Sequence, residues 1–248
     1  MSWRGTVSEA ERPDDENPYW ISFSDMMAGL LILFVLACLV LILELANTKD
    51  SVSDELEKLQ KAEEVRSEIL EEIRLDLEKL GIRIEESENN SVLHIPTDEL
   101  NFRSNSHQIP QNSRSRAVDI GQILFKRLSF SNRTEYLDTV FIEGHTDSRR
   151  SKRDGGNWAL SSRRSVSLWQ LWEDGLPVGE RLSELRNHSD QALFSVSGYA
   201  DTRRRVEQES SDSDYEKNRR IDVRITVKRP TVEAVSYTHL TLPTILLV

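Results

Sequence analysis

The chain has 248 residues, a formal net charge of −10 at pH 7 and a sequence pI near 5.1. This length allows a membrane anchor and one ordinary domain. The acidic balance argues against nucleic acid as the main partner, because neutralising phosphates requires a basic surface. The single cysteine, Cys38, excludes an intrachain disulfide.

The amino-terminal part predicts a membrane anchor. Residues 1–18 are polar and acidic and are expected to form a flexible tail, and residues 19–45 are expected to form one transmembrane helix. The apolar run from Tyr19 to Leu43 would span about 37 Å as a helix, which is enough to cross a bilayer. A signal peptide is the alternative, but the acidic start and the missing small-residue cleavage site after Leu43 argue against it. The flanking basic residues barely indicate an orientation.

An acidic residue, Asp25, lies inside this apolar segment. Along a helix it would lie roughly 8 Å deeper than Trp20. A carboxylate at such a place costs on the order of 3 kcal/mol, so a functional site is the default hypothesis. Burial disfavours the charged form of a carboxylate and therefore favours proton binding. The alternative is an interfacial helix cap, which the apolar residues before Asp25 disfavour.

Residues 46–81 predict an amphipathic helical linker. Apolar side chains recur in steps of three and four from Val52 to Leu80, which is typical of an amphipathic helix or a coiled coil. One interpretation is a dimerising stalk, and the other is a helix that packs on its own domain. Charged residues on the remaining faces favour the stalk, and Gly81 is a plausible stop signal.

Residues 82–230 predict a two-layer α+β domain with the order β-α-β-α-β-β. Acidic, serine-rich residues 207–217 are expected to form a solvated loop. The tail, residues 231–248, has no partner pattern and is interpreted as appended, or alternatively as a native apolar tail. The expected strands cover residues 82–85, 91–95, 138–143, 193–198 and 221–227, with a turn at Asn89-Asn90 and helices over residues 112–128 and 157–172.

Three motifs in this domain carry its chemistry. A predicted strand leads into Gly144-His145-Thr146-Asp147, and Arg164 follows on the next predicted helix. A carboxylate at a strand end and a guanidinium on the next helix can face one cleft. Together they suit a zwitterion, because the carboxylate takes an ammonium and the guanidinium holds a carboxylate. An internal ion pair between Asp147 and Arg164 is the structural alternative.

These motifs resemble OmpA-like peptidoglycan-binding domains. The resemblance covers about residues 82–230 and combines Gly-His-Thr-Asp, Asn-x-x-Leu-Ser-x-x-Arg from Asn157, and Asn-Arg-Arg-Ile from Asn218. It implies binding of the diaminopimelate in peptidoglycan stem peptides, with Asp147 and Arg164 clamping the zwitterion. Thr146, Asn157 and Arg220 are implied as supporting residues. A long basic loop, residues 148–156, departs from the family pattern, although it could be plain solvated charge.

The segment Tyr19-Trp20-Ile21-Ser22-Phe23-Ser24-Asp25-Met26-Met27 resembles the membrane helix of MotB-type stator subunits, most closely the B subunit of Zorya anti-phage systems. This resemblance implies a homodimer and a multi-pass MotA-like partner. It also implies an inner-membrane, single-pass protein with a cytoplasmic N-terminus and a periplasmic domain. Asp25 would bind the transported ion, H⁺ rather than Na⁺, with help from Ser22 and Ser24.

The sequence does not indicate an enzyme, a cofactor or a metal. His145 has no second histidine or cysteine near it in the sequence to support metal or nucleophilic chemistry. The alternatives to a proton-driven defence motor are a flagellar-type stator and a passive tether between membrane and cell wall. In a weaker alternative, the basic loop binds something other than the cell wall.

Overall fold

The computed structural model describes residues 18–86, 91–100, 102–103, 105–152 and 154–229. The chain divides into two compact units between Asp54 and Glu55. The predicted tails, residues 1–17 and 231–248, and the predicted turn at Asn89-Asn90 lie outside the described residues.

The first unit contains the beginning of helix α1 (Pro18–Lys79). Large apolar side chains from Met26 to Leu45 are exposed around the whole helix. A helix that is apolar on every side is typical of a membrane span. By length and composition, α1 can cross a membrane.

The second unit is built on a five-stranded mixed sheet with the order β1-β2-β5-β3-β4. Its strands are β1 (Glu85–Glu86), β2 (Val92–Pro96), β3 (Leu137–Gly144), β4 (Phe194–Gly198) and β5 (Arg220–Val227). Strands β3 and β4 are parallel, whereas the other neighbours are antiparallel. The first strand begins later than the predicted residues 82–85, and Ile82 and Ile84, which precede it, are buried in the core.

The two faces of the sheet differ in chemistry because successive side chains of a strand point to opposite faces. One face is apolar and packs into the core, through Leu93, Ile95, Val140, Ile142, Ile221, Val223 and Ile225. The alternate positions carry buried polar groups on the other face, among them His94, Glu143 and Asp222.

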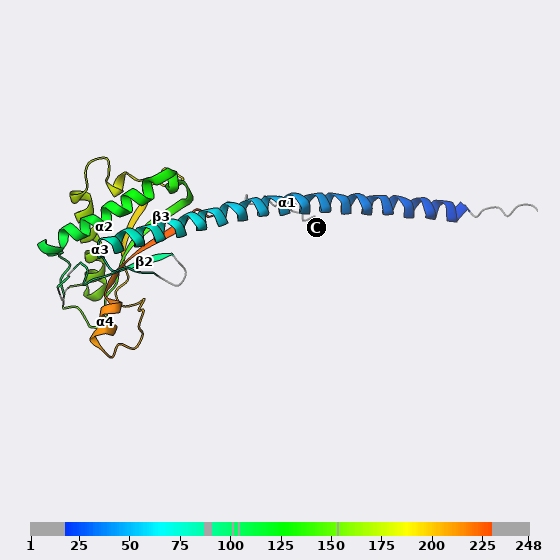
Figure 1. Ribbon diagram of the computed structural model, residues 1–248. Coiled ribbons are helices and arrows are strands. Elements are labelled where there is room, and N and C mark those ends of the chain that lie inside the picture. Colours follow the sequence, from blue (N-terminus) through cyan, green and yellow to red (C-terminus); the bar gives the residue numbers. More distant parts are fainter. Residues whose placement is uncertain (1–17, 87–90, 101, 104, 153, 230–248) are drawn as a thin grey trace, which may run out of the picture. The chain divides into compact units, whose positions relative to one another are not determined.

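Helices α2 (Gln111–Ser129) and α3 (Gly156–Gly175) lie beside each other (Figure 1), and α3 packs on β3 and β4. Their buried residues recur in steps of three and four, which is the period of an amphipathic helix. Two glycines allow the close approach. A Cβ at Gly144 would lie 2.2 Å from the carbonyl oxygen of Ser161, and one at Gly121 would lie 2.5 Å from Trp172.

The last turns of α1 are part of the domain core. Val65, Ile69, Leu70, Ile73 and Leu77 are buried in the same cluster as the sheet. Ion pairs add to this packing, because the guanidinium of Arg133 contacts Glu72 and that of Arg127 contacts Asp76. Over residues 65–77 the alternative interpretation, a helix that packs on its own domain, describes the structure, and the dimerising stalk stays a prediction for the residues before them.

A short helix replaces part of the predicted solvated loop. Helix α4 (Asp212–Asn218) begins with a capping box, in which Ser211 and Asp214 satisfy each other's backbone N–H groups. Hydrogen bonds from Ser211 and Ser210 lower the pKa of Asp214 to about 2. The element order therefore gains a helix before β5, while the predicted α+β fold class is confirmed. Two 3-10 helices, η1 (Phe130–Tyr136) and η2 (Leu182–Glu184), complete the domain.

Candidate functional site

The site lies at one edge of the sheet, where β3 ends at Gly144. The backbone N–H of His145 donates to Arg220 at the start of β5, at 3.0 Å. The N–H of Thr146 donates to Ala200, just after β4, at 2.8 Å. Three strands therefore fix the course of the turn that carries Asp147.

A cavity of about 650 Å³ opens beside this turn. It brings together four of the predicted site residues: Thr146, Asp147, Asn157 and Arg164. The remaining lining residues are mostly polar or basic: Phe102, Asn105, Arg149, Arg150, Ser151, Lys152, Leu160, Asp212, Glu216 and Arg219.

Asp147 is 6% exposed and is neutralised by two arginines. Its Oδ2 accepts from Arg149 at 2.6 Å and from Arg219 at 2.8 Å, and its Oδ1 accepts from the backbone of Arg149 at 3.1 Å. Burial alone would raise the pKa of Asp147, but the hydrogen bonds from Arg149 and Arg219 lower it below its ordinary value. The carboxylate is therefore charged at neutral pH.

Arg164 is buried on α3, in the wall of the same cavity. Its Nε donates to the carbonyl of Ser106 at 2.9 Å, and its guanidinium lies 5.2 Å from the ring centre of Phe102. These contacts hold the guanidinium plane in place. The predicted alternative, an internal pair with Asp147, is not what neutralises that carboxylate, because its ion-pair partners are Arg149 and Arg219.

Asn157 and Thr146 support the turn in different ways. Asn157 accepts from the backbone of Ser151 at 2.9 Å and donates to the carbonyl of Asp147 at 3.3 Å. It therefore ties the basic loop to the Asp147 turn. Thr146 is 3% exposed, and its hydroxyl has no hydrogen-bond partner within the described part of the chain. A buried hydroxyl without a partner is costly unless a ligand or water satisfies it.

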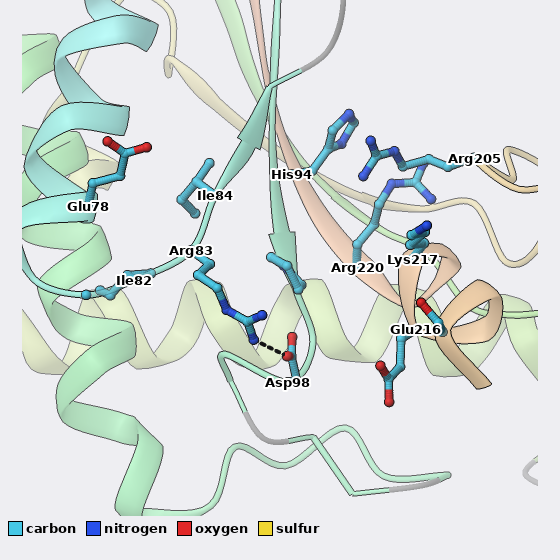
Figure 2. A pocket seen from close by; sticks show the side chains of 13 residues that line it. Glu78, Ile82, Arg83, Ile84, His94, Asp98, Arg205, Glu216, Lys217 and Arg220 are labelled. Atoms are coloured by element: carbon cyan, nitrogen blue, oxygen red, sulfur yellow. Dashed lines mark hydrogen bonds and ion pairs between the residues drawn. The ribbon is translucent and has the colours of Figure 1, made fainter. Parts of the chain in front are cut away.

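Arg220 does not line this cavity. It lies in a second pocket of about 510 Å³, together with His94, Arg205 and Lys217 (Figure 2). Its Nε donates to Asp222 at 3.0 Å. The neighbouring arginine, Arg219, is the one whose guanidinium contacts Asp147, at 2.8 Å.

Asp222 is the centre of a buried polar cluster on the second face of the sheet. It lies 2.6 Å from Nδ1 of His94 and 3.1 Å from Nε2 of His145. Burial raises the pKa of Asp222, but contacts with both histidines and the charge of Arg220 lower it well below its usual range. The sequence placed no second histidine near His145, and the fold corrects this by supplying His94 from β2.

The ligand atoms of Glu143, His145 and Asp222 lie within 4.8 Å of one another. However, the carboxylate of Glu143 already receives the guanidinium of Arg224, and that of Asp222 receives Arg220. Each of the two carboxylates is therefore already paired with an arginine of the same chain.

Asp25, Ser22 and Ser24 lie in the first unit, near the start of α1, and their side chains are exposed. Residues three and four apart share a helix face. Ser22 therefore lies on the face of Asp25, together with Ala28 and Gly29, whereas Ser24 is turned away from it.

Sequence reasoning did not assign Arg149, Arg219 or Tyr215 to the site. Arg149 lies in the basic loop that departs from the resemblance, and its guanidinium lies 4.2 Å from the ring centre of Tyr215 on α4. The loop's unusual charge was the available signal. Arg219 and Arg220 are adjacent in one motif, so only the register of β5 separates their roles.

Comparison with known proteins supports the fold of this domain. Residues 101–219 match the model of the OmpA family. A MotB-like protein from Desulfovibrio vulgaris is similar in structure, with a TM-score of 0.52 and 19% identity over 68% of this chain and 99% of that chain. The domain therefore has an OmpA-like α+β fold with a mixed sheet.

Two further solved structures are similar at lower scores. The cell wall anchor of the T6SS from Pseudomonas aeruginosa has a TM-score of 0.44 and 22% identity over 63% of this chain and 95% of that chain. The periplasmic domain of Helicobacter pylori MotB has a TM-score of 0.43 and 17% identity over 58% of this chain and 81% of that chain. No curated protein matches the chain.

Proposed function

We propose that the domain binds the diaminopimelate of peptidoglycan stem peptides in the cavity beside Asp147. The observation that carries this proposal is that one cavity is lined by a buried carboxylate, a buried guanidinium and the unsatisfied hydroxyl of Thr146. A zwitterion meets both charges, and its polar atoms satisfy the hydroxyl. The match of residues 101–219 to the OmpA family supports the same function.

Each residue has a definite task in this proposal. Asp147 receives the ammonium of the ligand, and Arg164 holds its carboxylate with the rigid fork of the guanidinium. Asn157 fixes the carbonyl of Asp147 and the start of the basic loop. The backbone carbonyl of Arg220 accepts a hydrogen bond from the N–H of His145 and so holds the turn in place.

Binding of the full-length protein to purified peptidoglycan sacculi tests this proposal. Asp147→Asn removes the charge that receives the ammonium, and Arg164→Lys keeps a positive charge but removes the planar fork. Both variants are expected to lose at least tenfold in affinity, whereas Arg150→Ala, in the same cavity wall, keeps most of it. Undiminished binding by Asp147→Asn would overturn the proposal.

We further propose that α1 anchors the protein in the bacterial inner membrane, with a cytoplasmic N-terminus and a periplasmic domain. Asp25 would carry a proton, rather than Na⁺, for an ion-driven motor formed by a homodimer of this chain and a multi-pass MotA-like subunit. The apolar, exposed surroundings of Asp25 support an ionisable site that is completed by other membrane helices. In this proposal Ser22, on the face of Asp25, shares the ion, and Ser24 contacts the adjacent face.

The mechanism follows from the charge of Asp25. Protonation removes its attraction to polar groups on the partner helices, which can then shift, and release of the proton restores it. One elementary charge crossing 100 mV supplies about 2.3 kcal/mol, enough to bias each step. With the domain held by the cell wall, motion would occur in the partner subunits.

We propose anti-phage defence of the Zorya type as the biological role, on the strength of the Tyr19–Asp25 motif. Purification from native membranes in mild detergent, with mass identification of associated proteins, tests the motor. A stoichiometric multi-pass subunit is expected, whereas its absence would leave a passive tether. Loss of phage resistance on deletion is expected, and a defect confined to swimming would instead indicate a flagellar-type stator.

A further inference from the structure

Arg149 occupies the carboxylate that the proposed ligand must reach. Its Nε and one terminal nitrogen lie 3.1 and 2.6 Å from Oδ2 of Asp147, and its backbone N–H donates to Oδ1. Arg219 also donates to Oδ2, at 2.8 Å. Each oxygen of an ionised carboxylate offers about two lone-pair sites, and three of these four donors address Oδ2. An ammonium that binds Oδ2 therefore has to displace one of them.

The two arginines differ in how easily they can leave. The side chain of Arg149 is 54% exposed, whereas that of Arg219 is 25% exposed. Arg149 also lies on the loop of residues 148–156, whereas Arg219 directly precedes β5. Because water reaches the Arg149 end of this pair and can solvate the released guanidinium, the contact of Arg149 can be exchanged for a ligand contact.

Helix α4 offers Arg149 a second set of partners. Its guanidinium already lies 4.2 Å from the ring centre of Tyr215. Asp212, one turn earlier on α4, lines the same cavity and adds to the favourable charge around Arg149. Tyr215 and Asp212 therefore favour the guanidinium of Arg149 independently of Asp147.

We infer that Arg149 is a specificity-determining residue that competes, from within the chain, with the ammonium of the ligand for Asp147. This inference rests on the proposed binding of diaminopimelate in the same cavity. An ammonium that binds Oδ2 of Asp147 displaces Arg149, and a ligand that also meets Arg164 gains a second contact that favours this exchange. Carboxylates alone would bind without opening this contact.

Titration calorimetry with two small probes on the full-length protein tests the inference. Diaminopimelate carries two ammonium groups, and pimelate is the same seven-carbon dicarboxylate without them. Arg149→Ala is expected to raise the affinity for diaminopimelate about threefold to fivefold. The affinity of the same variant for pimelate is expected to be unchanged or lower. Arg149→Lys, which keeps the charge without the fork, is expected to lie between Arg149→Ala and the unchanged protein.

Arg150→Ala is the matched control, because Arg150 lies next in the loop and lines the same cavity. If Arg150→Ala raises the affinity for diaminopimelate as much as Arg149→Ala does, the effect is one of general charge and the inference fails. It also fails if Arg149→Ala leaves or lowers the affinity for diaminopimelate. Asp147→Asn distinguishes failure of this inference from failure of the proposed function. If this variant binds diaminopimelate as tightly as the unchanged protein, the proposed function itself fails.

Discussion

The surroundings of an aspartate differ sharply between the two units of the chain. In the domain, Asp222 is 4% exposed and is met by two histidines and an arginine from the same chain. In the first unit, Asp25 is exposed on a helix whose neighbouring side chains, such as Met26 and Leu30, are exposed and apolar. A charge completed within the chain serves the fold, whereas a charge among exposed apolar side chains depends on what surrounds the helix.

The largest expected effect is on function, from Asp25→Asn. The amide keeps the size of the side chain but cannot bind and release a proton, so the proposed ion-driven activity should be abolished. Membrane insertion and the unfolding of the domain should be unchanged. Phage-resistance or ion-flux assays on membranes with equal protein content measure the activity. Full activity in this variant would remove Asp25 from the mechanism.

Asp222→Asn is expected to lower the stability of the domain, which Asp25→Asn leaves unchanged. Removal of this charge leaves Arg220 and two histidines buried without their anion, which should cost roughly 3–5 kcal/mol of the free energy of unfolding. Urea unfolding followed by tryptophan fluorescence measures it. Asp154→Asn, at an exposed turn, is the control and should change stability by less than about 0.5 kcal/mol. Equal losses of stability in Asp222→Asn and Asp154→Asn would show that the Asp222 cluster does not stabilise the folded domain.

The boundary between the units can be sharpened along α1 itself. Ile73 is fully buried in the domain core, so Ile73→Ala should cost about 3 kcal/mol through the cavity that it leaves. Leu75, on the same helix, is 41% exposed, and Leu75→Ala should cost less than about 1 kcal/mol. The same unfolding measurement compares them. Similar losses would mean that these turns do not pack as part of the domain.

The smallest expected effect is the loss of stability of the domain at low pH. The pKa of Asp222 is lower in the folded domain than its ordinary value near 3.8. Its charge therefore contributes stability that is fully present above about pH 4 and is lost as the pH falls through the folded pKa. We expect a loss on the order of 2 kcal/mol for the unchanged protein. A flatter profile for Asp222→Asn, in unfolding measured between pH 6 and pH 2, would identify the group.

The sequence predicted those parts of the fold that repeat with a clear period. The helices over residues 111–129 and 156–175, and the strands that end at Gly144 and begin at Arg220, lie within a few residues of their expected places. Helix α4 was missed because its polar composition resembles a loop, and only the capping box at Ser211 and Asp214 supports it. The burial of Ile73 was missed because an amphipathic pattern does not say which surface covers its apolar face.

The same distinction applies to the residues of the candidate site. Asp147 and Arg164 could be found because a strand end and the next helix approach each other by topology, and both line the cavity. The roles of Arg219 and Arg220 could not be separated, because they depend on where α4 ends and β5 begins. The contact of Arg149 depends on the conformation of its loop, which no periodicity describes.

The way α1 ends has a mechanical consequence. A pull on the chain from its amino-terminal side reaches the domain through turns whose side chains, from Val65 to Leu77, interlock sideways with the core. Tension along a helix held in this way acts in shear, so many contacts, including the Arg133–Glu72 clasp, must slide together. Forced detachment of these turns is set by the rate of that concerted step.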